Sequence, residues 1–136
     1  MTSRQTSAKG KRALCEPAVA GAAFATMAAR IASDLKGEDI VILDLRGLTS
    51  IADYFVIATG TSDRQLRAMA DQIDQQGRAV GQKPYGISGY EHGTWVLVDF
   101  VDVVVHLFDE EHRSYYDLEL LWGDAPRIDW QRSPSA

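Results

Sequence analysis

Two runs of β-branched and aromatic residues, separated by only two residues, limit most strongly what this chain can fold into. Residues 94–100 and 103–108 both have the composition of β-strands. The link between them, Val101-Asp102, leaves room only for a tight reversal. The sequence therefore predicts an antiparallel hairpin in which Phe100 lies opposite Val103.

This register gives the hairpin two unlike faces, because side chains alternate along a strand. One face is wholly apolar and should pack beneath helices; it holds Val96, Val98, Phe100, Val103, Val105 and Leu107. The other face is mixed; it holds Trp95, Leu97, Asp99, Val104, His106 and Phe108. A large aromatic beside a few polar groups suits a recognition surface, whereas a covering helix would make the same residues ordinary core. A shift of one residue in register would exchange the two faces.

Helical periodicity occurs both before and after the hairpin in the sequence. A stripe of apolar residues from Phe24 to Leu35 predicts a helix that Gly37 should end. Ser62 and Gln65 form a capping box, which predicts that a second helix follows. Three acids at residues 109–111 favour the start of a last helix, which should carry its apolar side as far as residue 122.

The remaining strands complete the expected architecture. Strands are predicted at residues 40–45 and 54–59, and a short one near Ile87. The order α-β-β-α-(β)-β-β-α predicts an α/β fold with a mixed central β-sheet that carries helices. We expect a single domain over residues 17–130, with a disordered basic tail at 1–16 and a short disordered tail at 131–136.

Charge is divided unevenly between the tail and this domain. Residues 1–15 hold four of the basic residues and no acid, so the remainder has ten Lys and Arg against nineteen Asp and Glu, a formal net charge of −9. Phosphate backbones repel a body this acidic, so we expect little direct nucleic-acid contact and a basic protein as partner. No run approaches the roughly 18 apolar residues of a membrane span. The single cysteine, Cys15, fits a reducing compartment such as the cytoplasm, although an acid-poor start also imitates a targeting segment.

Patterns typical of catalysis or metal binding are mostly missing. The three histidines lack metal-ligand spacing, and no P-loop or nucleophile elbow occurs. One enzyme alternative stays open, because residues 60–62 enter a helix N-terminus that could hold a phosphate while Asp99 and Asp102 hold Mg²⁺. Two ligands on one strand face should stand two residues apart, however, and these stand three apart. We expect no catalytic residue, no cofactor and no metal; a homodimeric scaffold is the other alternative.

Six short segments occur in a specific order and spacing. They are DIVILD at 39–44, DYFVIATGTS at 53–62, WVLVD at 95–99, DVVVH at 102–106, RSYYDLE at 113–119 and LW at 121–122. Together they resemble the ribosomal silencing factors, also called the Iojap-related proteins. Two positions depart from that family's pattern: Ser88 stands where Glu is usual, and Val101 stands where Gly is usual. Because valine resists the positive φ of a type I′ turn, a wider turn is expected here.

The resemblance implies a nucleotidyltransferase-like fold without the catalytic acids, and a translation repressor rather than an enzyme. Members bind the large ribosomal subunit through its L-fourteen protein and sterically block joining with the small subunit, and many form homodimers. On this basis we expect Trp95 to anchor the interface, with acids opposite basic residues of the partner. The predicted partner-binding residues are Trp95, Leu97, Asp99, Asp102, Val104, His106 and Arg113.

Overall fold

A five-stranded mixed sheet organises the part of the chain that the computed structural model describes, residues 21–112 and 125–131. The helices and strands, in chain order, are α1 (Gly21–Asp34), β1 (Glu38–Asp44), β2 (Tyr54–Gly60), α2 (Asp63–Ala79), β3 (Gly86–Ser88), β4 (Trp95–Asp99) and β5 (Val103–Asp109). The strand order is β1-β2-β5-β4-β3, with β2 and β5 parallel and every other pair antiparallel. This confirms the predicted mixed sheet.

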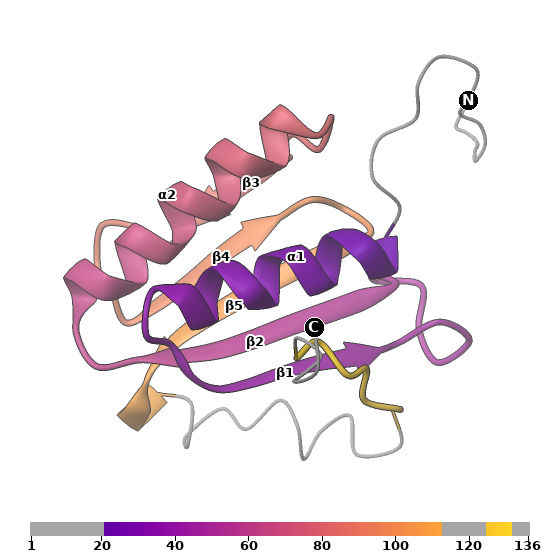
Figure 1. The fold of residues 1–136 in the computed structure, drawn as a ribbon, viewed down its shortest axis with the longest axis horizontal. Helices are drawn as coiled ribbons and strands as arrows, with labels where there is room; N and C mark the ends of the chain where they lie inside the picture. The colour runs from indigo at the N-terminus through magenta and orange to yellow at the C-terminus, as the bar shows by residue number, and fades with distance from the viewer. Residues whose placement is uncertain (1–20, 113–124, 132–136) are drawn as a thin grey trace.

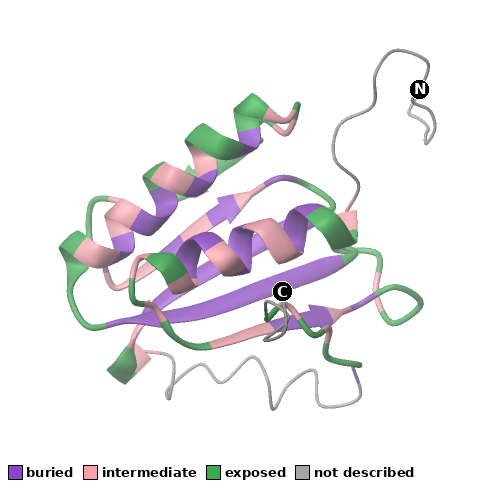
Figure 2. Cartoon of the chain, in the orientation of Figure 1, coloured by how far each residue is buried: buried purple, intermediate pink, exposed green. Residues whose placement is uncertain are grey.

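Both helices lie on one face of this sheet (Figure 1). The larger core fills the space beneath them, and Phe24 of α1 meets Phe100 there with ring centroids 4.6 Å apart. A second apolar cluster occupies the opposite face, around Phe55, Ile57 and Phe108. Strands β2 and β5 are therefore buried on both faces, as expected for the parallel pair at the centre of a sheet (Figure 2).

The two helix boundaries follow recognisable capping chemistry. The Ser62 hydroxyl accepts from the Gln65 amide at 3.1 Å, which confirms the predicted cap of α2. At the end of α1 the left-handed residue is Lys36, with φ 73, rather than a glycine. The Gly37 and Lys36 amides then donate to the carbonyls of Ala32 and Ser33, as in a Schellman motif. Lys36 therefore takes the left-handed position expected of Gly37, and Gly37 follows it as the next residue of the motif.

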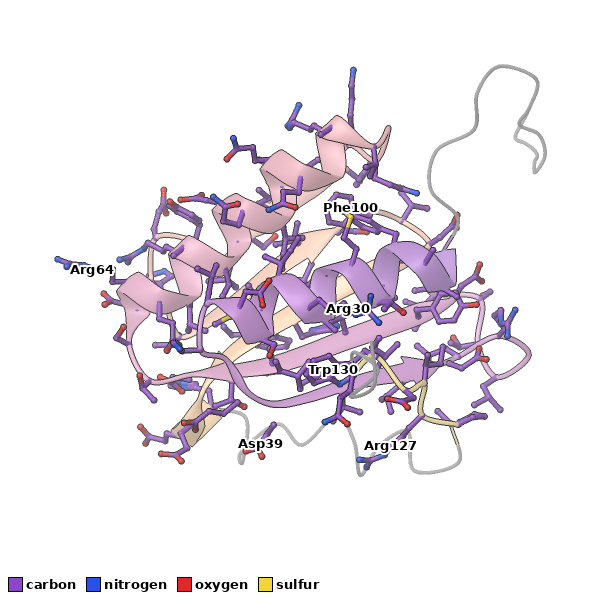
Figure 3. All side chains as sticks on the ribbon, in the orientation of Figure 1. Arg30, Asp39, Arg64, Phe100, Arg127 and Trp130 are labelled. Atoms are coloured by element: carbon purple, nitrogen blue, oxygen red, sulfur yellow. The ribbon has the colours of Figure 1, made fainter. Side chains whose placement is uncertain are left out.

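Residues 125–131, here called the C-terminal strap, run along the outer edge of β1. The Asp44 amide donates to the Pro126 carbonyl at 2.8 Å, and the Ile128 amide donates to the Ile42 carbonyl at 3.0 Å. The Trp130 indole donates to the Ile40 carbonyl at 3.0 Å, and Arg30 of α1 donates to the Trp130 carbonyl at 2.8 Å (Figure 3). The strap therefore satisfies an edge that would otherwise be open to pairing with another strand.

The predicted last helix is visible only at its start. Residues 110–112 are helical, and the Asp109 carboxylate accepts from the His112 amide at 2.8 Å, as an N-cap does. The rest of that helix lies outside the described residues, as do the predicted tail at 1–16 and all but residue 131 of the predicted tail at 131–136, so the domain limits stay predictions. No helix in the described ranges is long and apolar enough to cross a membrane.

Candidate functional site

The β4–β5 hairpin has the predicted register. Trp95 pairs with Phe108, Leu97 with His106 and Asp99 with Val104, so the apolar and mixed faces are as the sequence indicates. The apolar face joins the core beneath α1 and α2, and the mixed face lies on the other side of the sheet. The mixed face is therefore where the predicted partner-binding residues of the hairpin come together.

The turn stays two residues long despite Val101, so the expectation of a wider turn was wrong. Val101 adopts a φ of 76, and the Asp102 amide donates back to the Phe100 carbonyl at 3.0 Å, which closes a tight γ-turn. The Phe100 amide donates to the Val103 carbonyl at 2.9 Å and keeps the strands in register. This backbone conformation is strained for a β-branched residue.

Asp99 and Asp102 both help to hold this turn in place. The Asp99 carboxylate accepts from the Val101 amide at 2.7 Å, an Asx-turn that the Asp-x-Val spacing could have indicated. The Asp102 carbonyl accepts from the amides of Asp53 and Tyr54 at 2.8 and 3.0 Å, so the turn is tied to the start of β2. The Asp99 side chain is half-buried, whereas Asp102 is exposed.

An aromatic group surrounds Trp95 on the mixed face. Its ring stacks on Phe108 with centroids 4.9 Å apart, and its indole Nε1 donates to His106 Nδ1 at 3.2 Å. His106 lies diagonally across the strand pair from Trp95. The His106 and Phe55 rings are in T-shaped contact, with centroids 4.5 Å apart. Trp95 remains half-buried, as does Leu97. The indole is thus held by several neighbours while part of it stays accessible.

His106 and Val104 are buried beneath this surface, at 5% and 7% exposure. Burial lowers the pKa of His106 to about 4, so its ring is neutral near pH 7 and can accept from Trp95. Neither side chain is presented for direct contact in this conformation. His106 instead accepts the indole hydrogen bond, and Val104 lies opposite Asp99 on the same face. Arg113 lies outside the described residues, so its predicted contact stays a prediction.

Acidic residues lie at the turn end of the sheet, and the loop that joins β1 to β2 adds exposed apolar residues. Asp44 and Asp53 lie at the adjoining ends of β1 and β2, next to the Asp102 turn. The Arg46 guanidinium binds Asp44 at 2.8 Å and lowers the pKa of that carboxyl. The connecting loop also exposes Leu48 and Ile51, at 46% and 66%. Of these residues, Asp53 meets the hairpin directly, because its amide donates to the Asp102 carbonyl.

The loop before β4 is clamped to α2. Arg67 donates to the carbonyls of Tyr90 and Glu91 at 2.8 and 2.7 Å, and the Tyr90 hydroxyl donates to Asp71 at 3.0 Å. Gly93 comes so close to α2 that a Cβ there would lie 2.4 Å from the Cβ of Asp63. These contacts hold the loop that leads into β4, so they hold the end of the hairpin that carries Trp95, opposite the turn.

A phosphate bound at residues 60–62 would need backbone and hydroxyl groups that already cap α2. The Thr61 amide donates to the Gln65 side-chain carbonyl at 2.6 Å, while the Ser62 hydroxyl accepts from the Gln65 amide. A Cβ on Gly60 would meet Leu66, so this glycine is needed for close packing of β2 against α2. Across the described ranges no three His, Cys, Asp or Glu residues gather where they could hold a metal ion.

Comparison with known proteins relates this arrangement to one family. A family model described as "Ribosomal silencing factor during starvation" matches residues 20–136. The ribosomal silencing factor RsfS of Bacillus subtilis is 47% identical over 103 residues, which cover 76% of this chain and 87% of that protein. This chain belongs to the ribosomal silencing factor family. The chloroplastic protein Iojap of Arabidopsis thaliana is 35% identical over 93% of this chain and 52% of its own length.

Solved structures of related proteins share the fold. A crystal structure of a Chromobacterium violaceum protein superimposes with a TM-score of 0.75 and 36% identity, covering 85% of this chain and 95% of that chain. A Bacillus halodurans protein gives a TM-score of 0.70 and 34% identity over 80% of this chain and 99% of its own. The predicted family and the predicted fold class are therefore confirmed.

Proposed function

We propose that this protein represses translation by binding the large ribosomal subunit through its L-fourteen protein, so that the small subunit cannot join. The Trp95 indole is the single observation that carries the proposal. It is half-buried on the sheet face away from the helices, stacked on Phe108 and flanked by Leu97. A partly accessible aromatic that its neighbours hold in place is a typical interface anchor.

Charge at the turn end of the sheet supports a basic partner. Asp99 and Asp102 border the mixed face, and the domain without its tail has a formal net charge of −9. These carboxylates meet Lys or Arg side chains of the ribosomal protein and steer its approach. Because such contacts lie at the rim, they affect the association rate and its salt dependence more than the final affinity.

The remaining predicted residues have distinct parts in this proposal. Val104 lies opposite Asp99 and packs in the same apolar cluster as Leu97 and Trp95, and His106 accepts the hydrogen bond from the indole. Arg113 supplies a further polar contact. The same face could pair two copies of the chain, so a homodimer would have to open before docking. The protein acts in the cytoplasm by occupying a surface, with no chemical step.

Sucrose-gradient sedimentation with purified large subunits tests the proposal. Wild type should co-sediment, and Trp95→Glu should bind about thirtyfold more weakly, since loss of a central anchor costs about 2 kcal/mol or more. Gln75→Glu is the matched control, because it adds the same charge at an exposed position of α2, on the helix side of the sheet. Subunit joining followed by light scattering should be inhibited by wild type and by Gln75→Glu only.

Other results would favour the alternatives. If wild type does not co-sediment, the ribosomal proposal fails. If Trp95→Glu converts a dimer into monomers and still binds the subunit, the mixed face is a dimer interface instead. Calorimetric titration with ATP and Mg²⁺ tests the enzyme alternative, which predicts heat of binding at residues 60–62. Absence of binding at millimolar nucleotide would remove that alternative.

A further inference from the structure

We propose that His106 is a positioning residue, which holds the Trp95 indole in its docking orientation and does not itself touch the partner. This inference rests on the proposed function, because it explains how the anchor of that interface is prepared. The Trp95 Nε1–H donates to His106 Nδ1 at 3.2 Å, between side chains on neighbouring strands. The hydrogen bond restrains rotation of the indole within the plane in which it stacks on Phe108.

The hydrogen bond also defines which form of His106 is present. Nδ1 accepts, so it carries no proton, and the neutral ring has its proton on Nε2. That Nε2 is buried and has no hydrogen-bond partner among the described residues. A buried donor without a partner destabilises a fold. An apolar ring of similar size would fill the same space between Phe55 and Phe108 without this penalty.

Core packing therefore does not account for a histidine at this position. Its Nδ1 accepts the hydrogen bond from Trp95, whereas its buried Nε2 has no partner among the described residues and lowers the stability of the fold. What the histidine adds is a fixed acceptor for the indole. A side chain that is already ordered loses less conformational entropy when it binds, so the acceptor should raise affinity for the partner. Stability and docking are thus expected to respond in opposite directions when His106 is replaced.

Two substitutions separate the roles. His106→Phe keeps an aromatic ring and removes the acceptor, so we expect unfolding by urea at pH 7 to be unchanged or harder, and binding to large subunits to weaken roughly three- to tenfold. His106→Asn places a side-chain oxygen near the position of Nδ1 and should recover most of the binding. Both variants leave Asp99, Asp102 and the turn unaltered.

A measurement on the free protein makes the test independent of the ribosome. The Trp95 indole N–H resonance, assigned by its loss in Trp95→Phe, should exchange slowly with water in wild type and in His106→Asn. It should exchange faster in His106→Phe. Equal exchange in wild type and His106→Phe would overturn the inference, as would equal affinity of the two for large subunits. Failure of the wild type to bind large subunits, with the exchange pattern as expected, would refute the proposed function and leave the restraint on Trp95 established.

Discussion

The carboxylate of Asp99 accepts a hydrogen bond from the backbone N–H of Val101 at 2.7 Å, across the tightest point of the hairpin. Val101 has a φ of 76 there, which L-residues with branched side chains rarely adopt. One predicted docking residue therefore stabilises a strained backbone conformation, and the strain lies at the rim of the proposed interface. Interface geometry and fold stability are coupled at this turn.

Val101→Gly should stabilise the protein. Glycine removes the strain of positive φ, typically about 1–3 kcal/mol, and costs about 0.5–1 kcal/mol of added unfolded-state entropy. Little packing is lost, because Val101 is 58% exposed. We expect a net gain of about 1 kcal/mol in urea unfolding. Val101→Ala keeps a Cβ and should gain nothing; equal gains in both variants would assign the strain to the branched side chain rather than to the positive φ, and no gain in Val101→Gly would show that the turn is unstrained.

Asp99→Ala should destabilise the hairpin by about 1–2 kcal/mol, since the Val101 amide loses its acceptor. Asp99→Asn retains a side-chain oxygen and should lose less. The loss should also shrink in a Val101→Gly background, where the turn no longer needs the same support. A double-mutant cycle of unfolding free energies measures this coupling. Strictly additive effects would mean that Asp99 and Val101 act independently.

Acidification should weaken the fold in a window set by His106. Its folded-state pKa is lowered by burial to about 4, whereas the unfolded value is about 6.5. Above pH 6.5 both states are neutral and this contribution is fully present. Between pH 6.5 and 4 only the unfolded chain takes up the proton, so stability falls by about 3 kcal/mol. His106→Phe should flatten urea-derived stability across that window.

The carboxylate Asp44 titrates outside this window. The hydrogen bond from the Arg46 side chain lowers the pKa of Asp44, so its contribution is present above its unfolded value and is lost as the pH falls through the lower, folded value. That loss begins near pH 4. If the stability of His106→Phe falls between pH 6.5 and 4 as much as that of wild type does, a group other than His106 causes the decline.

Local pattern was sufficient to predict the hairpin register. A two-residue connection places Phe100 opposite Val103, and alternation then assigns each face, whereas the wider turn expected at Val101 left a shift of register open. The capping box of Ser62 and Gln65 was equally local. By contrast, the burial of His106 and Val104 depends on packing by Phe55, which is some fifty residues away in the chain and has no local signal near the hairpin.

Residues 125–131 illustrate the same limit. They have neither helical nor strand periodicity, and their partners on β1 are more than eighty residues away. The bonds from Asp44 to Pro126 and from Ile128 to Ile42 join main-chain groups, which no residue type indicates. The positive φ of Lys36 had no signal in the sequence, and Val101 was expected to avoid one, because glycine is the residue that normally marks such positions. Tertiary context decided these features.

Trp130 should control whether the C-terminal strap stays on β1. Trp130→Ala removes the indole bond to the Ile40 carbonyl and the apolar contact with the main core. We expect hydrogen exchange at the Asp44 amide to quicken, because that amide donates to Pro126 of the strap. The Leu45 amide donates to Asp53 instead and should keep its protection, which makes it an internal control.

A second variant distinguishes local release from general destabilisation. Arg30→Ala removes the bond to the Trp130 carbonyl and leaves the indole in place, so exchange at Asp44 should quicken by a smaller factor. Gln131→Ala alters an exposed side chain at the end of the strap and should have no effect. If exchange at Asp44 and Leu45 rises together in Trp130→Ala, the strap opens only when the whole sheet unfolds. Selective exchange at Asp44 would instead identify the strap as a separate unit, whose release exposes the β1 edge to pairing with another chain.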